Sequence, residues 1–175
     1  IFEFVNSSNV YIDELGEVPI LNWGWGEYQL LIIDNSVFSQ IDDGSEVFII
    51  DEFGINNQSC SDDYGPVIVA SGIYESENQD YNLFVCTESL DLCGFGGERY
   101  PGYVKENNIL IVVETPEGIQ YSGTISQVDI GEGIFGDPMT HITNIDFTRS
   151  NLDFILSNSN NLQSRSNYNY KIYRN

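Results

Sequence analysis

Residues 41–60, IDDGSEVFIIDEFGINNQSC, contain the stretch that decides the fold. The stretch opens with DDG, which favours a turn because aspartate and glycine tolerate the backbone conformations that tight turns require. Residues 45–51 follow as a strand. Apolar side chains occupy both faces of that strand: Val47, Phe48, Ile49 and Ile50. A strand that is apolar on both faces is covered on both sides, so we expect these four side chains to be buried in the middle of a two-layer β structure.

Short apolar segments separated by turn residues continue on both sides of this strand. Further strands are predicted at residues 27–34, 66–74, 81–86, 108–114, 119–123, 125–130 and 141–147. TPEG at residues 115–118 indicates the clearest hairpin, because its proline and glycine stand where a type I turn prefers them. No window shows a sustained helical period. We therefore predict an all-β fold, an antiparallel β-sandwich of jelly-roll or immunoglobulin-like type with extended N- and C-terminal segments.

Four segments around the central strand form a wider pattern. They are GSEVFIID at residues 44–51, Cys60, GPVIVASG at residues 65–72 and PGYVKENN at residues 101–108. Over residues 37–121 this pattern resembles a β-sandwich module of secreted and virion proteins from marine bacteria and their phages, in which dGD-x-h-G-h-F-D precedes C-h-G and a later G-(F/Y)-x-x-(G/N). The sequence departs from it at Ser45, where aspartate is usual, and at Phe48, where a small residue is commoner. The resemblance implies a structural or surface-display module without known catalysis.

The charge of the chain excludes one class of partner. Its 175 residues hold 27 acidic and 6 basic side chains, a net charge of −21, together with 41% hydrophobic residues. That apolar content is ordinary for a folded domain, so the charge does not signal disorder. A strongly negative domain repels nucleic acid and anionic membranes, and no run of eighteen apolar residues is present. We expect neither nucleic-acid binding nor membrane insertion.

The charge is unevenly distributed along the chain. Residues 1–148 hold two basic and 26 acidic residues, a net −24, whereas residues 149–175 carry +3. We therefore separate a β-sandwich domain at residues 1–150 from an Asn- and Tyr-rich C-terminal strand or arm at residues 151–175. The predicted assembly residues in this arm are Tyr168, Tyr170, Ile172 and Tyr173. Such a strand can pair with a neighbour's sheet edge or complete its own sheet, and the sequence leaves both open.

Three cysteines cannot all pair within one chain. Cys86 and Cys93 bracket a short loop and are the predicted disulfide, with Cys60 bonded to either of them as the alternative. With a single histidine and no matching spacing, zinc ligation is not expected. A disulfide fits the extracellular, cell-surface or virion location that we expect for this chain.

Trp23 and Trp25 are the candidate ligand-binding residues. Separated by one glycine, their side chains project from the same side of an extended segment. Such a pair could form a platform for a sugar ring. A core plug at one end of the sandwich is the interpretation we favour, because large aromatic side chains more often cover cores.

Calcium is the one cofactor that the sequence suggests, because hard oxygen ligands are abundant in the predicted loops. The acidic clusters are Asp42 with Asp43, Asp51 with Glu52, Asp62 with Asp63, and Glu75 with Glu77 and Asp80. The proposed ligands are Asp42, Asp43, Asp62 and Asp63. EF-hand spacing is absent, so the alternative is a solvated acidic surface suited to a salty medium.

No catalytic constellation is predicted. His141 is the only histidine, it stands within an alternating strand pattern, and no Gly-x-Ser-x-Gly motif is present. We therefore expect a non-catalytic extracellular or virion structural subunit, which assembles with copies of itself or with other structural subunits through sheet edges and terminal segments. The alternative is a calcium-assisted carbohydrate- or surface-binding adhesion module, with a glycan as its partner.

Overall fold

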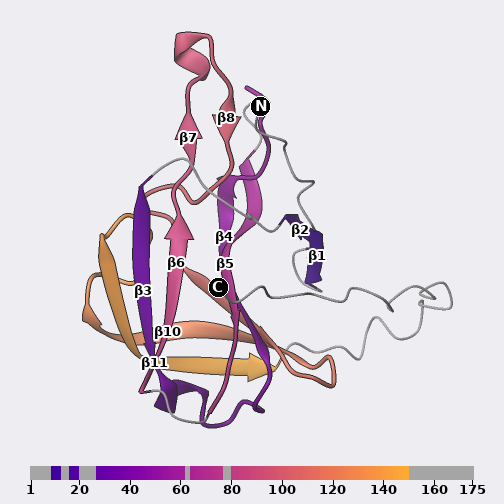
Figure 1. Cartoon of the computed structure of the whole chain (residues 1–175), viewed down its shortest axis with the longest axis vertical. Helices are drawn as coiled ribbons and strands as arrows, with labels where there is room; N and C mark the ends of the chain where they lie inside the picture. The colour runs from indigo at the N-terminus through magenta and orange to yellow at the C-terminus, as the bar shows by residue number, and fades with distance from the viewer. Residues whose placement is uncertain (1–8, 13–15, 20–26, 62–63, 77–79, 150–175) are drawn as a thin grey trace, which may run out of the picture.

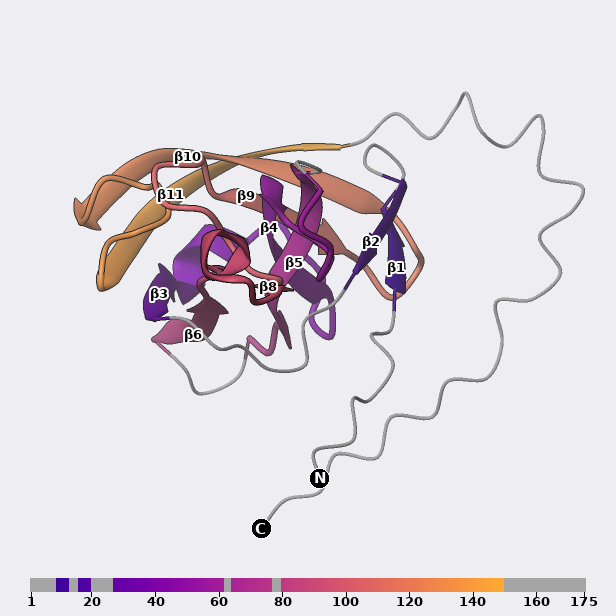
Figure 2. The same cartoon turned by 90° about the horizontal axis from the view of Figure 1, so that it is seen from above.

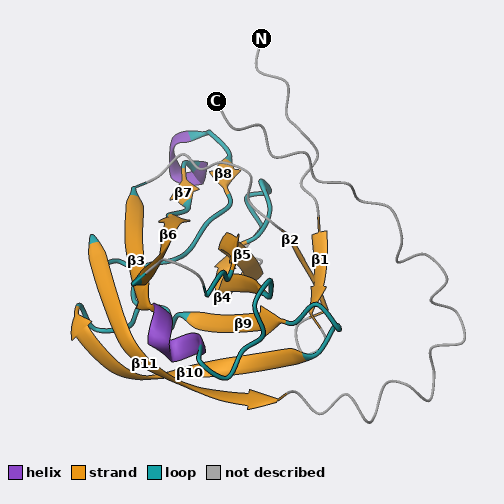
Figure 3. Cartoon of the chain, turned by 60° about the horizontal axis from the view of Figure 1, so that its bottom comes forward, coloured by secondary structure: helices purple, strands orange, loops and turns teal. Residues whose placement is uncertain are grey.

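The computed structural model describes residues 9–12, 16–19, 27–61, 64–76 and 80–149. These residues form strands and loops with two short 3-10 helices (Figure 3), which confirms the predicted all-β class. The elements are β1 (Asn9–Ile12), β2 (Gly16–Pro19), β3 (Tyr28–Asp34), η1 (Asn35–Phe38), β4 (Glu46–Ile55), β5 (Tyr64–Ile73), β6 (Tyr81–Thr87), β7 (Leu90–Asp91), η2 (Cys93–Phe95), β8 (Arg99–Tyr100), β9 (Leu110–Glu114), β10 (Gln120–Ile130) and β11 (Met139–Arg149). Among the described residues, neither helix has the length and apolar character that crossing a membrane requires.

Seven strands form one curved sheet in the order β5-β4-β9-β10-β11-β3-β6. Its neighbouring strands are antiparallel except β11 and β3, which are parallel. The sheet curls until its end strands β5 and β6 lie beside each other (Figures 1 and 2), so that it is nearly closed into a barrel. The predicted two-sheet sandwich is not confirmed. Because a curled sheet also buries one face of every strand, it produces the same alternating pattern in the sequence as a sandwich does.

Strand β4 is covered on both faces, as its sequence predicts. Val47 and Ile49 belong to the main core inside the barrel, which also contains Leu31, Phe38, Ile111 and Ile142. Phe48 and Ile50 point the other way and form a smaller cluster with Ile68 and Val112. All four β4 side chains are fully buried, so the predicted burial of both faces is confirmed.

The hairpin of β1 and β2 is a separate two-stranded sheet outside the barrel. Strand β2 lies beside β5, and the hairpin stands on the side of β4 and β5 that faces away from the barrel interior (Figure 2). That side carries the smaller cluster. This part of the molecule is therefore more than one layer deep, although the main sheet is not a sandwich.

Strands β9 and β10 form the predicted hairpin. The N–H of Gly118 donates to the carbonyl of Thr115 over 2.8 Å, and Gly118 adopts a φ of 80°. Glycine is favoured at such a positive φ because it has no Cβ. Strands β10 and β11 form a second hairpin, whose register shifts between Ile125 and Ile130 mark β-bulges.

A narrow projection at one end of the molecule is formed by β7, η2 and β8 (Figure 1). A disulfide joins Cys60 to Cys93, the first residue of η2, with the two Cα atoms 5.7 Å apart. The predicted pairing of Cys86 with Cys93 is therefore wrong, and the alternative pairing through Cys60 is the one present. Cys86 lies on β6 with its side chain fully buried in the main core.

Candidate functional site

Several predicted site residues lie outside the described residues. They are Trp23, Trp25, Asp62, Asp63, Tyr168, Tyr170, Ile172 and Tyr173. The sugar platform, the core plug and the assembly strand therefore stay predictions.

Asp42 and Asp43 organise a turn. The carboxylate of Asp43 accepts a hydrogen bond from the backbone N–H of Ser76, and this bond lowers the pKa of Asp43. The backbone carbonyl of Asp42 accepts a bond of 2.6 Å from the hydroxyl of Ser45. Within the described ranges, no three His, Cys, Asp or Glu side chains are grouped so that they could hold one metal ion. Calcium binding remains a prediction, and Asp43 already has a structural role.

Asp51 is not an open loop carboxylate, which corrects its grouping with the acidic loops. It lies within β4 and is fully buried. Its two oxygens accept bonds of 2.8–2.9 Å from the N–H of Val104, the N–H of Phe53 and the side-chain amide of Asn107. Burial raises the pKa of Asp51, and the three donors partly oppose that rise. Asp51 therefore joins β4 to residues 103–107 rather than offering oxygens to an ion.

The residues joined to Asp51 are tightly packed. The ring of Tyr103 stacks on that of Phe135 with the centroids 4.8 Å apart, and both rings are buried. A Cβ on Gly102 would lie 2.4 Å from the backbone nitrogen of Ser89, so only glycine fits there. The FIID and PGYVKENN segments, far apart in the sequence, thus meet in one structural junction.

An apolar surface lies on the outer side of the sheet where it ends at β6. We call it the apolar face, and it consists of Tyr28, Leu30, Ile32, Tyr81, Leu83, Val85 and Met139. Leu83 is 64% exposed, Val85 58% and Tyr81 50%. Strand pairing places Leu30 between Val85 and Met139, and Ile32 opposite Leu83, so these side chains are neighbours across β11, β3 and β6. Contiguous exposed apolar surfaces of this kind are typical of interaction sites.

His141 borders the apolar face and is held by two carboxylates. Its Nε2 lies 2.7 Å from an oxygen of Asp34, and its Nδ1 lies 3.6 Å from an oxygen of Asp129. The ring of Tyr81 meets the imidazole edge-on at 5.6 Å. Through these two contacts His141 links β11 to β3 and β10, and its purely structural role stays a prediction.

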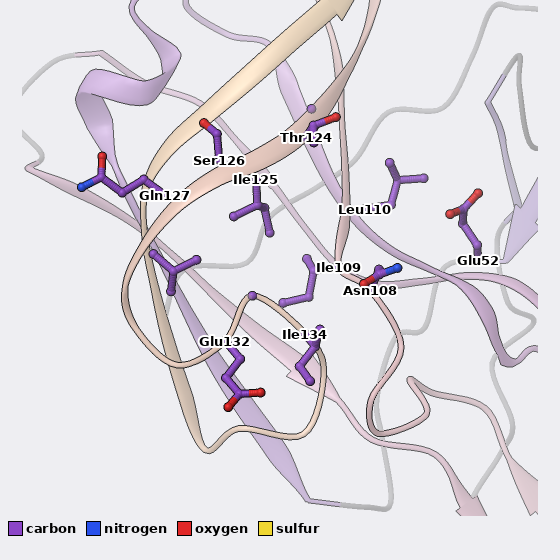
Figure 4. Close-up of a pocket in the computed structure, with 13 residues that line it drawn as sticks. Glu52, Asn108, Ile109, Leu110, Thr124, Ile125, Ser126, Gln127, Glu132 and Ile134 are labelled. Atoms are coloured by element: carbon purple, nitrogen blue, oxygen red, sulfur yellow. The ribbon is translucent and has the colours of Figure 1, made fainter.

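A groove of about 570 Å³ opens between β10 and the segments opposite it (Figure 4). One wall is the 123–128 part of β10, and the other is formed by residues 108–110 and 132–134. Ile109, Ile125 and Ile134 point toward its centre, while Glu132 and Glu52 lie to either side (Figure 4). The groove combines an apolar floor with an acidic rim.

The projection carries the most exposed apolar side chain of the described residues, Phe95, at 92%. The disulfide holds its η2 end. Arg99 joins β8 to β7, because its guanidinium pairs with Asp91 at 2.9 Å, and it lies 5.3 Å from the centroid of the Tyr64 ring. The N–H of Cys93, and then Arg99, lower the pKa of Asp91. The projection is therefore a fixed structure rather than a loose loop.

No pattern in the sequence predicted the apolar face or the groove. The alternation in YNLFVC did show apolar residues on both faces of β6, but this pattern predicts burial, not exposure. The groove depends on residues from β4, β9, β10 and the loop after β10, which no local pattern brings together. The chain matches no protein-family model, no curated protein and no solved structure.

Proposed function

We propose that this chain is a non-catalytic structural subunit of an extracellular, cell-surface or virion assembly, which joins copies of itself or other subunits through the apolar face and its terminal segments. The observation that carries the proposal is the exposure of Leu83, Val85 and Tyr81 together on the last strand of the sheet. Water contact with adjacent apolar side chains is costly at about 25 cal/mol per Å², and a second subunit would remove that contact.

The position of the apolar face favours assembly over a small-molecule site. It is a surface over three adjacent strands rather than an enclosed cavity, and aromatic side chains lie within it. Strand β6 is also an end strand of the sheet. Its outer edge lies beside β5, but the two strands are not paired by backbone hydrogen bonds. Exposed apolar surfaces beside sheet ends are typical of subunit contacts.

Two further observations support an extracellular or virion setting. The Cys60–Cys93 disulfide requires an oxidising environment to persist. The net charge of −21 keeps separate copies soluble until a specific contact overcomes their repulsion. The resemblance to the surface and virion β-sandwich module agrees with this setting. The hairpin of β1 and β2 lies beside β5 as a second layer, and a sandwich module also has two layers.

The same proposal makes residues 151–175 the terminal assembly element. Their positive charge is complementary to the acidic body, and alternating Tyr168, Tyr170 and Ile172 suit an added strand. Calcium-assisted glycan binding remains the alternative. It depends on Trp23, Trp25 and other residues outside the described part, whereas the apolar face lies within it.

The test replaces the exposed apolar side chains without disturbing the core. A Leu83→Asn, Val85→Thr double variant should fold with an unchanged far-ultraviolet spectrum but self-associate about five- to thirtyfold more weakly in sedimentation velocity, since two interface side chains cost about 1–2 kcal/mol. Phe53→Asn is the matched control, because Phe53 is also exposed but lies on β4 outside the apolar face. A full-length chain that stays monomeric at millimolar concentration, or equal losses in both variants, would contradict the proposal.

A further inference from the structure

The groove exists because β9 and β10 separate. Their pairing covers only Gln120 to Gly123 on β10, with Ile111 to Glu114 on β9. Beyond Gly123, β10 continues to Ile130 beside β11, while residues 107 and 108 instead pair with residues 134 and 135 of the following loop. The sheet is therefore open along one side of β10.

The open side of β10 can accept another strand. Residues 124–128 pair with β11 on one side, and among the described residues no strand pairs with them on the other. Backbone N–H and C=O groups along such an edge are a template for an added strand. The groove gives that strand an apolar floor, made by Ile109, Ile125 and Ile134 (Figure 4).

The far wall of the groove is held in place by buried hydrogen bonds. The side-chain amide of Gln29, fully buried, donates to the carbonyl of Ile134 at 3.1 Å and accepts from the N–H of Gly136 at 3.0 Å. The N–H of Phe135 donates to the carbonyl of Asn107 over 2.9 Å. Because both flanks of residue 134 are fixed, the groove is preformed and an entering segment finds it open.

The electrostatics of the groove select a basic occupant. Glu52 and Glu132 are exposed at its rim, and its lining includes no lysine, arginine or histidine. The end of the chain has the opposite character. Residues 154–175 contain Arg165, Lys171 and Arg174 and no acidic residue, and residues 168–172 alternate apolar and polar as YNYKI. An extended segment of this kind presents Tyr168, Tyr170 and Ile172 on one side.

We propose that the groove is the acceptor site for residues 165–175 of a neighbouring copy, added as a strand along the open side of β10. Tyr170 and Ile172 cover the isoleucine floor, and Lys171 and Arg174 lie near the acidic rim. This inference rests on the proposed function and specifies one of its contacts. The acceptor and the donor segment are different surfaces of one chain, so each copy can receive one neighbour and enter another, which gives an open-ended assembly.

Cross-linking of mixed full-length chains tests the contact. One chain carries Glu132→Cys at the groove rim and the other Asn169→Cys, and a short bismaleimide joins cysteines that lie close together. The native cysteines do not interfere, because Cys86 is buried and the other two form a disulfide. The matched control is Glu117→Cys, another exposed glutamate, in the turn between β9 and β10. We expect a covalent heterodimer with Glu132→Cys at least about fivefold above that with Glu117→Cys.

A charge exchange tests the same contact without a cross-linker. Glu132→Lys alone and Lys171→Glu alone should each weaken self-association about two- to fivefold in sedimentation velocity, the scale of one exposed ion pair. The two changes together should restore it. A double variant weaker than both single variants would overturn the pairing of rim and tail.

The outcomes separate this inference from the proposed function. If the chains self-associate without a cross-link at the groove, or cross-link equally well at residue 117, the groove is not the acceptor site for residues 165–175. The proposed structural role would remain. Cross-linking only within a single chain that carries both cysteines shows that the segment binds its own groove, which also overturns it. A chain that never self-associates contradicts both.

Discussion

Asp43 and Asp51 show how differently two acids of one short stretch are used. The carboxylate of Asp43 binds the N–H of Ser76 beside an exposed turn, and that of Asp51 is buried between β4 and residues 103–107. The sequence predicts the burial of Val47 to Ile50, because their alternation covers both strand faces. It does not predict the role of Asp51, because the donors on Val104 and Asn107 stand more than fifty residues further along.

At the same scale, Glu46 and Glu114 are direct partners across β4 and β9. Partial desolvation, and then repulsion from Glu114, raise the pKa of Glu46, although its side chain is exposed. A carboxyl with a raised folded-state pKa favours the folded state most when it is protonated. Its contribution is therefore fully present below the unfolded pKa, near 4.5, and is lost as the pH rises through the raised folded value.

We expect Glu46→Gln to raise the free energy of unfolding by about 0.2–1 kcal/mol at pH 7, the usual scale of a like-charge pair directly opposite in a sheet. The difference from the native sequence should shrink toward zero near pH 3.5, below the unfolded pKa of Glu46. Urea unfolding at the two pH values measures it. Glu117→Gln, at an exposed turn, is the control for the loss of one negative charge, and an equal gain there would assign the effect to net charge instead.

At the scale of elements, β4 and β6 share one sequence pattern and differ in their surroundings. Both alternate apolar residues on two faces, but β4 is covered on both sides and β6 only on the inner one. The hairpin of β1 and β2 stands outside β4 and β5, and nothing among the described residues covers Leu83 and Val85 in the same way. An apolar pattern on both faces predicts that both faces of a strand are suited to burial. The surface that covers the second face need not belong to the same chain.

The disulfide gives a prediction about the projection. Cys60 and Cys93 are separated by 33 residues, and closing a loop of that length stabilises a fold by up to roughly 3–4 kcal/mol. A Cys60→Ser, Cys93→Ser variant should melt at a lower temperature in a single cooperative transition, because β7 and β8 lie outside the seven-stranded sheet. Calorimetry of the native chain with and without dithiothreitol should show the same shift.

Cys86 provides the check on this assignment. Burial raises the pKa of its thiol to about 12, so it should not react with a thiol reagent in the folded protein. One thiol per chain should become reactive in denaturant without reductant. Two or more reactive thiols in the folded chain would contradict the disulfide between Cys60 and Cys93.

At the scale of the whole molecule, net charge dominates the expected response to ions. With −21 charges, repulsion opposes folding, and any cation relieves part of it. We expect millimolar calcium to raise the melting temperature modestly above that in EDTA, and Asp42→Asn with Asp43→Asn to reduce the gain if that turn binds the ion. Sodium chloride at matched ionic strength is the control. An equal rise in sodium would leave only screening of an acidic surface, without a calcium site.

The closure of the sheet is the part of the fold that could not be predicted from the sequence. The β9–β10 and β10–β11 hairpins follow from neighbouring segments and turn residues. The parallel pair of β11 and β3 joins segments that no turn connects, and the pair is held by contacts such as that from Gln29 to Thr140, 111 residues apart. Local alternation records which face of a strand is buried, but not which distant strand lies beside it.

That parallel pair has a consequence for the order of folding as the chain is made or exported. Strands β4, β5, β9 and β10 can pair in succession as they emerge, but β3 lies between β11 and β6, and β11 is the last strand of the described residues to appear. A chain that lacks its final part leaves β3 and β6 without their link to the rest of the sheet, with the aggregation-prone strand edges exposed. Folding is therefore expected to finish only after β11 has emerged, which would favour a chaperone that covers the edges of β3 and β6 until then.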